Sequence, residues 1–258
     1  MSSSRRSTAG RALLALIIAL YLPLTGLAAP RIAIIIDDLG YALDAGMRAV
    51  NLPGPVSCAV LPGTPRGAML AERAHANGKD VLLHLPLQPV SPGGADEPGS
   101  LDLDMTRGQF ARTFAEHFDA VPHIVGISSH RGSLLTRHPG HMSWLMEEIS
   151  ARGPLFFIDS YTTHESVALK LAAESGVPAV RRDVFLDPDH EPGTVEREFA
   201  RLKRLATERG FAVGIGHPYP ETLTLLEREL PKLSAEGFEL VGISRYFGPG
   251  DEPLPEGE

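Results

Sequence analysis

The stretch Arg31-Ile-Ala-Ile-Ile-Ile-Asp-Asp-Leu-Gly-Tyr41 decides the fold class of this chain. Its apolar run, Ile32–Ile36, predicts a buried strand, so the carboxylates of Asp37 and Asp38 leave the sheet at its carboxyl end. Open α/β sheets and barrels bind their ligands at that end. Two adjacent carboxylates repel each other, and a cation or a catalytic proton relieves the repulsion. The pair therefore predicts a metal site, although the simpler alternative is that it caps the following helix.

Beyond this stretch, short apolar runs alternate with longer helical segments, which is the pattern of an α/β protein with a largely parallel sheet. Seven or eight such units favour a (β/α) barrel or near-barrel. The predicted strands are Ile32–Ile36, Val56–Val60, Asp80–His84, Ile124–Ile127, Leu155–Ile158, Ala179–Phe185, Phe211–Ile215 and Glu239–Ile243. The predicted helices are Ala42–Val50, Pro65–Ala76, Thr106–Phe118, His141–Ala151, Ser166–Glu174, Thr194–Glu208 and Glu221–Leu230. A long loop is predicted over Pro86–Gly99, which is rich in proline and glycine.

Composition narrows the class of protein. With 258 residues and 43% hydrophobic content, the chain is large enough for one sizeable core. A net charge of -8 provides no general basic surface, so we expect no nucleic-acid binding. Cys58 is the single cysteine, which excludes an intramolecular disulfide and a cysteine-rich zinc site.

The N-terminus has the composition of an export signal. Arg5, Arg6 and Arg11 precede an apolar stretch over residues 12–20, and small residues follow up to Ala29. We therefore predict a signal peptide over 1–29, a barrel domain over 30–247 and a disordered tail over 248–258. The expected location is the periplasm, with no stable membrane insertion after cleavage. The alternative is an uncleaved N-terminal anchor.

Polar residues of catalytic type recur where several predicted strands end. In a parallel barrel these ends lie on one rim, so residues far apart in the sequence converge there. One carboxylate and two neutral imidazoles suit zinc and leave a position for water, which is a site for amide hydrolysis. His138 and His141 form an alternative pair, but their sequence context indicates the start of a helix. The converging residues are Asp37, Asp38, His84, His130, Asp159 and His217.

Six motifs in order give the chain a family resemblance. They are Ile34-Ile-Ile-Asp-Asp-Leu-Gly-Tyr, His84-Leu-Pro, the segment 126–133 around His130, Phe156-Phe-Ile-Asp-Ser, Arg182-Asp-Val-Phe-Leu-Asp and Gly214-Ile-Gly-His-Pro. Together they resemble the divergent polysaccharide deacetylase family, a branch of the NodB-like carbohydrate esterases. The resemblance implies a distorted (β/α) barrel of seven to eight strands, a divalent metal such as zinc, and hydrolysis of N-acetyl groups on a glycan.

The resemblance also implies roles for single residues. Asp38, His84 and His130 would bind the metal, Asp37 would be the general base and His217 the general acid. The wider superfamily places its two metal histidines four residues apart on one segment, whereas no His-x-x-x-His occurs here. Three further residues are predicted to orient these groups or to contact substrate: Asp159, Asp183 and Arg131, which stands where the family usually has methionine.

These inferences lead to one functional expectation and two alternatives. We expect an exported metal-dependent hydrolase that deacetylates a cell-envelope or extracellular polysaccharide. One alternative is a non-catalytic envelope barrel that binds a glycan or a protein. The other is a metal-dependent amidase or esterase acting on another acyl substrate. The aspartate Asp37 and the histidine His217 favour an enzyme, because a binding module needs neither a base nor an acid.

Overall fold

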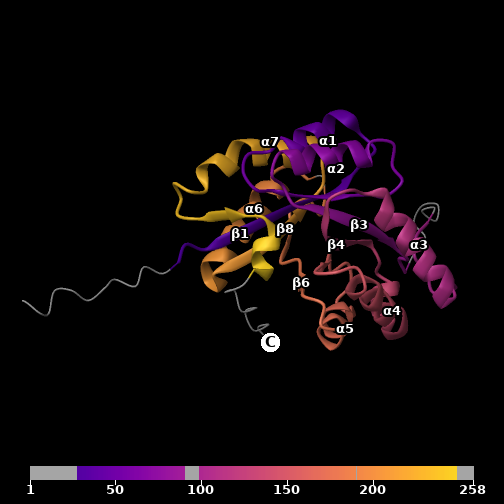
Figure 1. Cartoon of the computed structure of the whole chain (residues 1–258). Helices are drawn as coiled ribbons and strands as arrows, with labels where there is room; N and C mark the ends of the chain where they lie inside the picture. Colours follow the sequence, from indigo (N-terminus) through magenta and orange to yellow (C-terminus); the bar gives the residue numbers. More distant parts are fainter. Residues whose placement is uncertain (1–27, 91–98, 190, 249–258) are drawn as a thin grey trace, which may run out of the picture.

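The computed structural model describes residues 28–90, 99–189 and 191–248, and in these residues a single parallel sheet organises the chain. Its strands follow the order β6-β5-β4-β3-β2-β1-β8-β7, and β9 pairs with β1 outside this path. The sheet curls into an incomplete barrel, which confirms the predicted fold class (Figure 1). The strands are β1 Arg31–Leu39, β2 Ser57–Val60, β3 Val81–Leu87, β4 Ile124–Arg131, β5 Phe156–Asp159, β6 Ala179–Arg181, β7 Val184–Phe185, β8 Phe211–Gly216 and β9 Glu239–Val241.

Helices cover the outside of the sheet. In Figure 1, α1, α2 and α7 lie together on one side, whereas α4 and α5 lie on the other. The helices are α1 Leu43–Val50, α2 Gly67–Ala76, α3 Arg107–Ala120, α4 Pro139–Ser150, α5 Ala168–Glu174, α6 Thr194–Arg209 and α7 Pro220–Glu229, with short 3-10 turns η2 Leu135–Arg137, η3 Leu230–Lys232 and η4 Ile243–Phe247. Helix α4 begins two residues before its predicted start because Pro139 occupies its first position, where proline needs no hydrogen bond.

One predicted strand, Ala179–Phe185, is wrong. This segment forms two short strands at opposite edges of the sheet, because β6 pairs with β5 and β7 pairs with β8. Two residues cross the seam between the edges. The N–H of Arg182 donates to the carbonyl of Asp159, and the N–H of Asp183 donates to the carbonyl of Val213. The barrel is therefore joined at the seam by the turn between β6 and β7.

The strands that bear the histidines run further than predicted. Strand β3 continues past His84 to Leu87, and β4 continues past Ile127 to Arg131. The extension shortens the predicted loop Pro86–Gly99, of which residues 91–98 lie outside the described part of the chain. His84 and His130 are consequently held on paired strands and not on loops.

The barrel interior is closed at the end where the strands begin, which we call the floor. Phe247 of η4 stacks on Phe156, with ring centroids 4.5 Å apart, and Tyr246 lies over Phe211. The carboxylate of Asp80 accepts hydrogen bonds from the N–H and the hydroxyl of Ser244. The opposite end, where the strands finish, is the rim that carries the polar residues.

The predicted signal peptide lies mostly outside the described residues, since its first 27 positions are not described, and the predicted tail lies outside from residue 249 onward. Within the described ranges, every helix is too short or too polar to cross a membrane.

Candidate metal and catalytic site

A bulge in β1 sets the positions of Asp37 and Asp38. The pairing of β1 with β2 shifts between Ile36 and Leu39, and Asp38 adopts a left-handed backbone with φ 57°. Successive side chains of a regular strand point to opposite faces, whereas a bulge re-aims them. The carboxylates of both aspartates therefore lie close to one imidazole, that of His84, with Oδ2 of Asp37 at 3.6 Å and Oδ1 of Asp38 at 3.1 Å from its Nε2.

Strand register brings the two histidines together. His84 of β3 is paired with Ser128 of β4, and His130 lies two residues further along β4. Residues two apart on a strand share a face, so both imidazoles point to the same side of the sheet. Two neighbouring parallel strands thus bring the imidazoles of His84 and His130 together.

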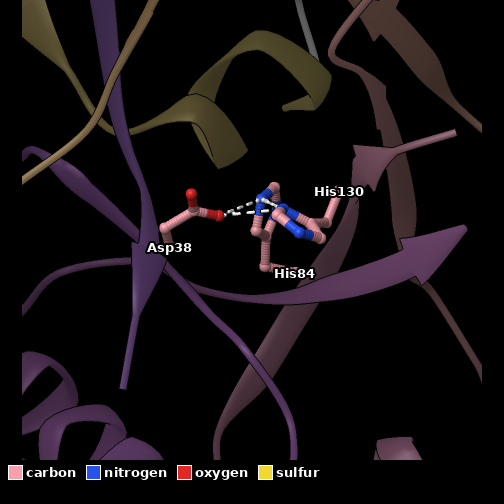
Figure 2. Close-up of side chains that lie close together, drawn as sticks. All are labelled: Asp38, His84 and His130. Carbon is pink, nitrogen blue, oxygen red and sulfur yellow. Dashed lines mark hydrogen bonds and ion pairs between the residues drawn. The ribbon is translucent and has the colours of Figure 1, made fainter. Parts of the chain in front are cut away.

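Three ligand atoms form a compact triangle at the rim. Oδ1 of Asp38 lies 3.1 Å from Nε2 of His84 and 2.9 Å from Nδ1 of His130, and the two nitrogens are 3.1 Å apart (Figure 2). Among the described residues, these three form the group of histidine, cysteine and carboxylate ligands close enough to share a metal ion. Ligand atoms around a tetrahedral zinc are separated by about 3.3 Å, since each bond is about 2.0–2.1 Å. The triangle therefore fits a small divalent cation.

The hydrogen bonding around the triangle also suits a cation. Nδ1 of His84 lies 2.7 Å from the hydroxyl of Ser128, so donation to this hydroxyl leaves the lone pair of Nε2 facing the centre. Oδ1 of Asp38 is buried and has no hydrogen bond of acceptable angle in the described structure. Burial opposes ionisation of Asp38, yet the imidazoles of His130 and His84 outweigh it and hold its pKa below the usual range. The carboxylate is thus available in its ionised form.

Asp37 is the more deeply buried aspartate. Burial raises the pKa of its carboxyl, and the nearby charge of Asp38 adds to this effect, while the surrounding imidazoles oppose it. Oδ1 of Asp37 is buried without a hydrogen-bond partner in the described part of the chain. A buried carboxylate with a raised pKa and a free oxygen is suited to accept a proton.

His217 follows β8 at the same rim and is held by Asp187, a residue that our sequence reasoning did not single out. Oδ1 of Asp187 lies 2.9 Å from Nδ1 of His217, and Oδ2 accepts the backbone N–H of His217 at 2.7 Å. A Cβ at Gly216 would lie 3.3 Å from Oδ2 of Asp187, so the glycine leaves room for this carboxylate. Burial lowers the pKa of His217, but the hydrogen bond and charge of Asp187 dominate and raise it.

Nε2 of His217 is 3.7 Å from Oδ2 of Asp38, so the imidazole borders the triangle. The signal for Asp187 was present in the sequence, as the last residue of the motif Arg182-Asp-Val-Phe-Leu-Asp. Its partner could not be read from the motif, because 30 residues separate it from His217.

Arg182, which our reasoning also left without a role, lies in the seam beneath the rim. Its Nε donates to the carbonyl of Ser160 and its Nη2 to that of Tyr161. Burial lowers the pKa of its guanidinium, while the charges of Asp37 and Asp159 favour the protonated form. Arg182 is therefore a half-buried cation, and among the neighbouring charges that of Asp37 favours its protonated form most.

The three residues predicted to support the site lie in different places. Asp159 accepts hydrogen bonds from the N–H of Tyr161 and the hydroxyl of Ser166, so it organises the loop after β5. Asp183 accepts from the N–H of Val213 and from Arg209, so its hydrogen bonds run away from the imidazoles. Arg131 ends β4 with φ 60°, and its carbonyl accepts the hydroxyl of Thr162. Of Asp159, Asp183 and Asp187, the aspartate whose described hydrogen bond reaches an imidazole of the rim is Asp187, which contacts Nδ1 of His217.

The alternative histidine pair stands at the start of α4. His138 is the N-cap of this helix, and its Nδ1 lies 3.1 Å from Nδ1 of His141. His141 is buried against Phe110 and Trp144. Burial and the neighbouring His138 lower its pKa. This pair caps and packs a helix, as its sequence context indicated.

Comparison with known proteins supports this picture of the fold. An uncharacterized protein of Haemophilus influenzae is 35% identical over 217 residues, which cover 84% of this chain and 76% of that protein. The crystal structure of the uncharacterized protein ATU2773 from Agrobacterium tumefaciens C58 superposes with a TM-score of 0.81 at 23% identity, covering 86% of this chain and 91% of that one.

A more distant structure has a named activity. The catalytic domain of peptidoglycan N-acetylglucosamine deacetylase from Eubacterium rectale superposes with a TM-score of 0.52 at 15% identity, covering 92% of this chain and 98% of that one. At this identity the likeness concerns the fold alone. The family model for divergent polysaccharide deacetylases matches residues 34–247, which include every residue of the triangle. The chain belongs to the divergent polysaccharide deacetylase family.

Proposed function

We propose that this protein is an exported zinc-dependent hydrolase that removes acetyl groups from an N-acetylated cell-envelope polysaccharide. The observation that carries the proposal is the triangle of Asp38, His84 and His130, whose ligand atoms lie 2.9 to 3.1 Å apart beside two further ionisable groups. Family membership supports the class of reaction. The basic and apolar composition of residues 1–29 supports export.

In this proposal, Asp38, His84 and His130 would hold the metal, since each offers one oxygen or nitrogen atom to the triangle. When bound, a divalent metal supplies a Lewis acid that polarises a substrate carbonyl and lowers the pKa of water towards about 7. Ser128 fixes the ring of His84 through the contact at its Nδ1. Such an outer partner sets the tautomer and orientation of a ligating imidazole.

Asp37 and His217 divide the proton transfers. Oδ1 of Asp37 is free of hydrogen bonds in the described structure, and we assign it to take the proton of the attacking water. Nδ1 of His217 is engaged by Asp187, so Nε2 is the atom that donates a proton to the leaving amine. Because Asp187 raises the pKa of His217, the imidazolium form needed for this donation is favoured.

The test of the reaction is acetate release by the zinc-reconstituted protein from chitooligosaccharides and from purified peptidoglycan. We expect release that requires zinc and that falls by at least about a hundredfold in Asp37→Asn, because the proton acceptor is lost. Asp44→Asn, an exposed aspartate of α1, is the matched control and should keep full activity. Zinc binding without acetate release from any of these glycans would overturn the proposal in favour of a binding protein.

The test of the metal site is zinc stoichiometry measured by elemental analysis. We expect one zinc per chain, lost in His84→Ala and in His130→Ala because each removes one of three protein ligands. His138→Ala is the matched control, since this histidine belongs to the alternative pair and caps α4. Zinc retained by both site variants but lost in His138→Ala would assign the metal to the other pair.

A further inference from the structure

One buried polar atom at the rim has no role in the proposed mechanism. Among the described residues, five buried side-chain atoms lack a hydrogen-bond partner, and three of them lie at the rim, on Asp37, Asp38 and Ser160. Oδ1 of Asp38 is a corner of the triangle, and Oδ1 of Asp37 is assigned to take a proton. The hydroxyl of Ser160 is left over, and this residue is only 7% exposed. A buried hydroxyl without a partner destabilises the folded state, so its presence indicates a ligand.

The alternation of side chains along β5 directs this hydroxyl into the barrel. Ile158 packs in the cluster inside the barrel, whereas Phe157 packs in the cluster beneath the helices. Asp159 also faces outward, since its carboxylate accepts the hydroxyl of Ser166 just before α5. Successive side chains of a strand point to opposite faces, so Ser160, which follows β5 directly, points inward.

Strand register places Ser160 beside the triangle. Ser128 of β4 pairs with Ile158 of β5, so two residues further along each strand His130 stands opposite Ser160. Neighbouring strands are about 4.8 Å apart, and both side chains point to the same side. The hydroxyl of Ser160 therefore borders the triangle on the side of β5, whereas His217 borders it on the side of β8.

The backbone of Ser160 is fixed by its neighbours. Its N–H donates to the hydroxyl of Ser129 at 3.0 Å, and its carbonyl accepts Nε of Arg182 at 2.8 Å. The next residue, Tyr161, has a left-handed backbone with φ 50°, and its N–H donates to the carboxylate of Asp159. Strained backbone persists where the surrounding structure fixes it, and such positions cluster at functional sites. The hydroxyl is therefore held in place before a ligand arrives.

We propose that the hydroxyl of Ser160 donates a hydrogen bond to the carbonyl oxygen of the acetyl group that is removed. The inference rests on the proposed function, which places the leaving nitrogen beside His217 and the carbonyl oxygen across the triangle from it. When the oxygen of water bonds to the carbonyl carbon, the π electrons of the carbonyl move to its oxygen, and Asp37 takes the proton of the water.

The second half of the reaction reverses this shift of charge. As the C–N bond breaks, the carbonyl oxygen regains its double bond and the nitrogen leaves with the bonding pair, which His217 protonates. The products are acetic acid, which ionises, and an amine. The hydroxyl of Ser160 keeps its proton throughout and stabilises the oxygen while that oxygen is negative.

Steady-state acetate release by the zinc-loaded, full-length chain from the N-acetylglucosamine tetramer tests this contact. We expect kcat to fall about a hundredfold in Ser160→Ala while KM changes less than about threefold, because the oxygen is negative only near the transition state. Ser160→Cys keeps the shape but donates weakly, so it should resemble Ser160→Ala. Ser150→Ala, at the exposed end of α4, is the matched control. Native kcat in Ser160→Ala, or rescue by Ser160→Cys, overturns the inference.

Isothermal titration tests the same contact without turnover, in an Asp37→Asn background that prevents hydrolysis. The probes are the acetylated tetramer and a tetramer in which a methylphosphonamidate replaces one acetamide and mimics the negative, tetrahedral state. Adding Ser160→Ala should weaken binding of the phosphonamidate by at least about tenfold and leave binding of the acetylated tetramer unchanged. Equal losses for the two probes, or no loss for either, contradict the proposed contact.

Thermal unfolding separates a catalytic role from a structural one. Ser160→Ala should match or exceed the native midpoint, because the hydroxyl has no hydrogen bond to lose in the described structure. Ser129→Ala should lower the midpoint, because that hydroxyl accepts the N–H of Ser160. A lower midpoint in Ser160→Ala would assign the hydroxyl to folding and overturn the inference. Unchanged acetate release in Ser160→Ala leaves the proposed function standing, whereas no release by the native protein overturns both proposals.

Discussion

The floor and the rim of the barrel both hold buried and half-buried ionisable groups but provide them with different partners. At the floor, the ammonium of Lys79 donates to the carbonyls of Leu52 and Gly54, and the carboxylate of Asp80 accepts from the N–H and hydroxyl of Ser244. At the rim, by contrast, one oxygen each of Asp37 and Asp38 is buried without a hydrogen bond in the described structure.

This difference separates stability from function within one barrel. Polar groups that are fully paired with backbone and hydroxyl dipoles hold the strands together, whereas groups with unused atoms are able to bind a ligand. In barrels of this kind, chemistry occurs at the carboxyl ends of the strands, and the other end contributes to stability. Three substitutions test whether the floor contributes to stability and the rim to ligand binding.

The largest effect on folding is expected at the floor. Asp80→Ala removes the acceptor for Ser244 and for the hydroxyl of Ser57, and it should lower the free energy of unfolding by about 2–3 kcal/mol. Urea denaturation monitored by circular dichroism measures this loss. Asp119→Ala, an exposed position of α3, is the control and should change stability little. The folded Asp80→Ala variant should bind zinc with the same affinity as the native protein. A lower zinc affinity would contradict the separation of stability at the floor from ligand binding at the rim.

A smaller effect of opposite sign is expected at the rim. In the metal-free protein, Asp37→Asn replaces a buried carboxylate that lies beside Asp38 and has an unpaired oxygen. The neutral amide removes the like-charge repulsion, so stability should rise by about 1 kcal/mol. The midpoint of thermal unfolding, measured for Asp37→Asn and for the native protein in the presence of a chelator, tests this prediction. A loss of stability would show that the rim, like the floor, is built for folding.

The smallest effect concerns the pH dependence of the floor. Burial lowers the pKa of Lys79, so the unfolded chain keeps this proton to higher pH than the folded one. The free energy of unfolding therefore rises with pH between the lowered pKa of Lys79 and about 10.5, the ordinary pKa of a lysine. Lys79→Met lacks this rise, so the stability of the native protein relative to the variant should increase across this interval. Burial raises the pKa of Cys58 to about 12 and the charge of Lys79 opposes this shift, so both proteins are compared in a Cys58→Ala background, which removes the titration of the thiol.

Particular residues show how far the sequence allowed the site to be predicted. Asp37, Asp38, His84, His130 and His217 were each identified because they follow apolar runs, and the structure brings all five to one rim. The role of Asp187 was missed, because a hydrogen bond across 30 residues leaves no local pattern. The strand Ala179–Phe185 was wrong for a related reason, since composition does not reveal that a seam divides it.

The sequence by itself determined the alternation of strands and helices and the order of polar residues at the ends of the strands, because apolar periodicity and turn residues act over a few neighbouring positions. Only the tertiary structure decided which of these residues meet. The register of β3 against β4 aligned His84 with His130, and the bulge in β1 turned Asp37 and Asp38 to the same imidazole. Register and bulges depend on pairing between distant segments, so no local stretch of sequence contains them.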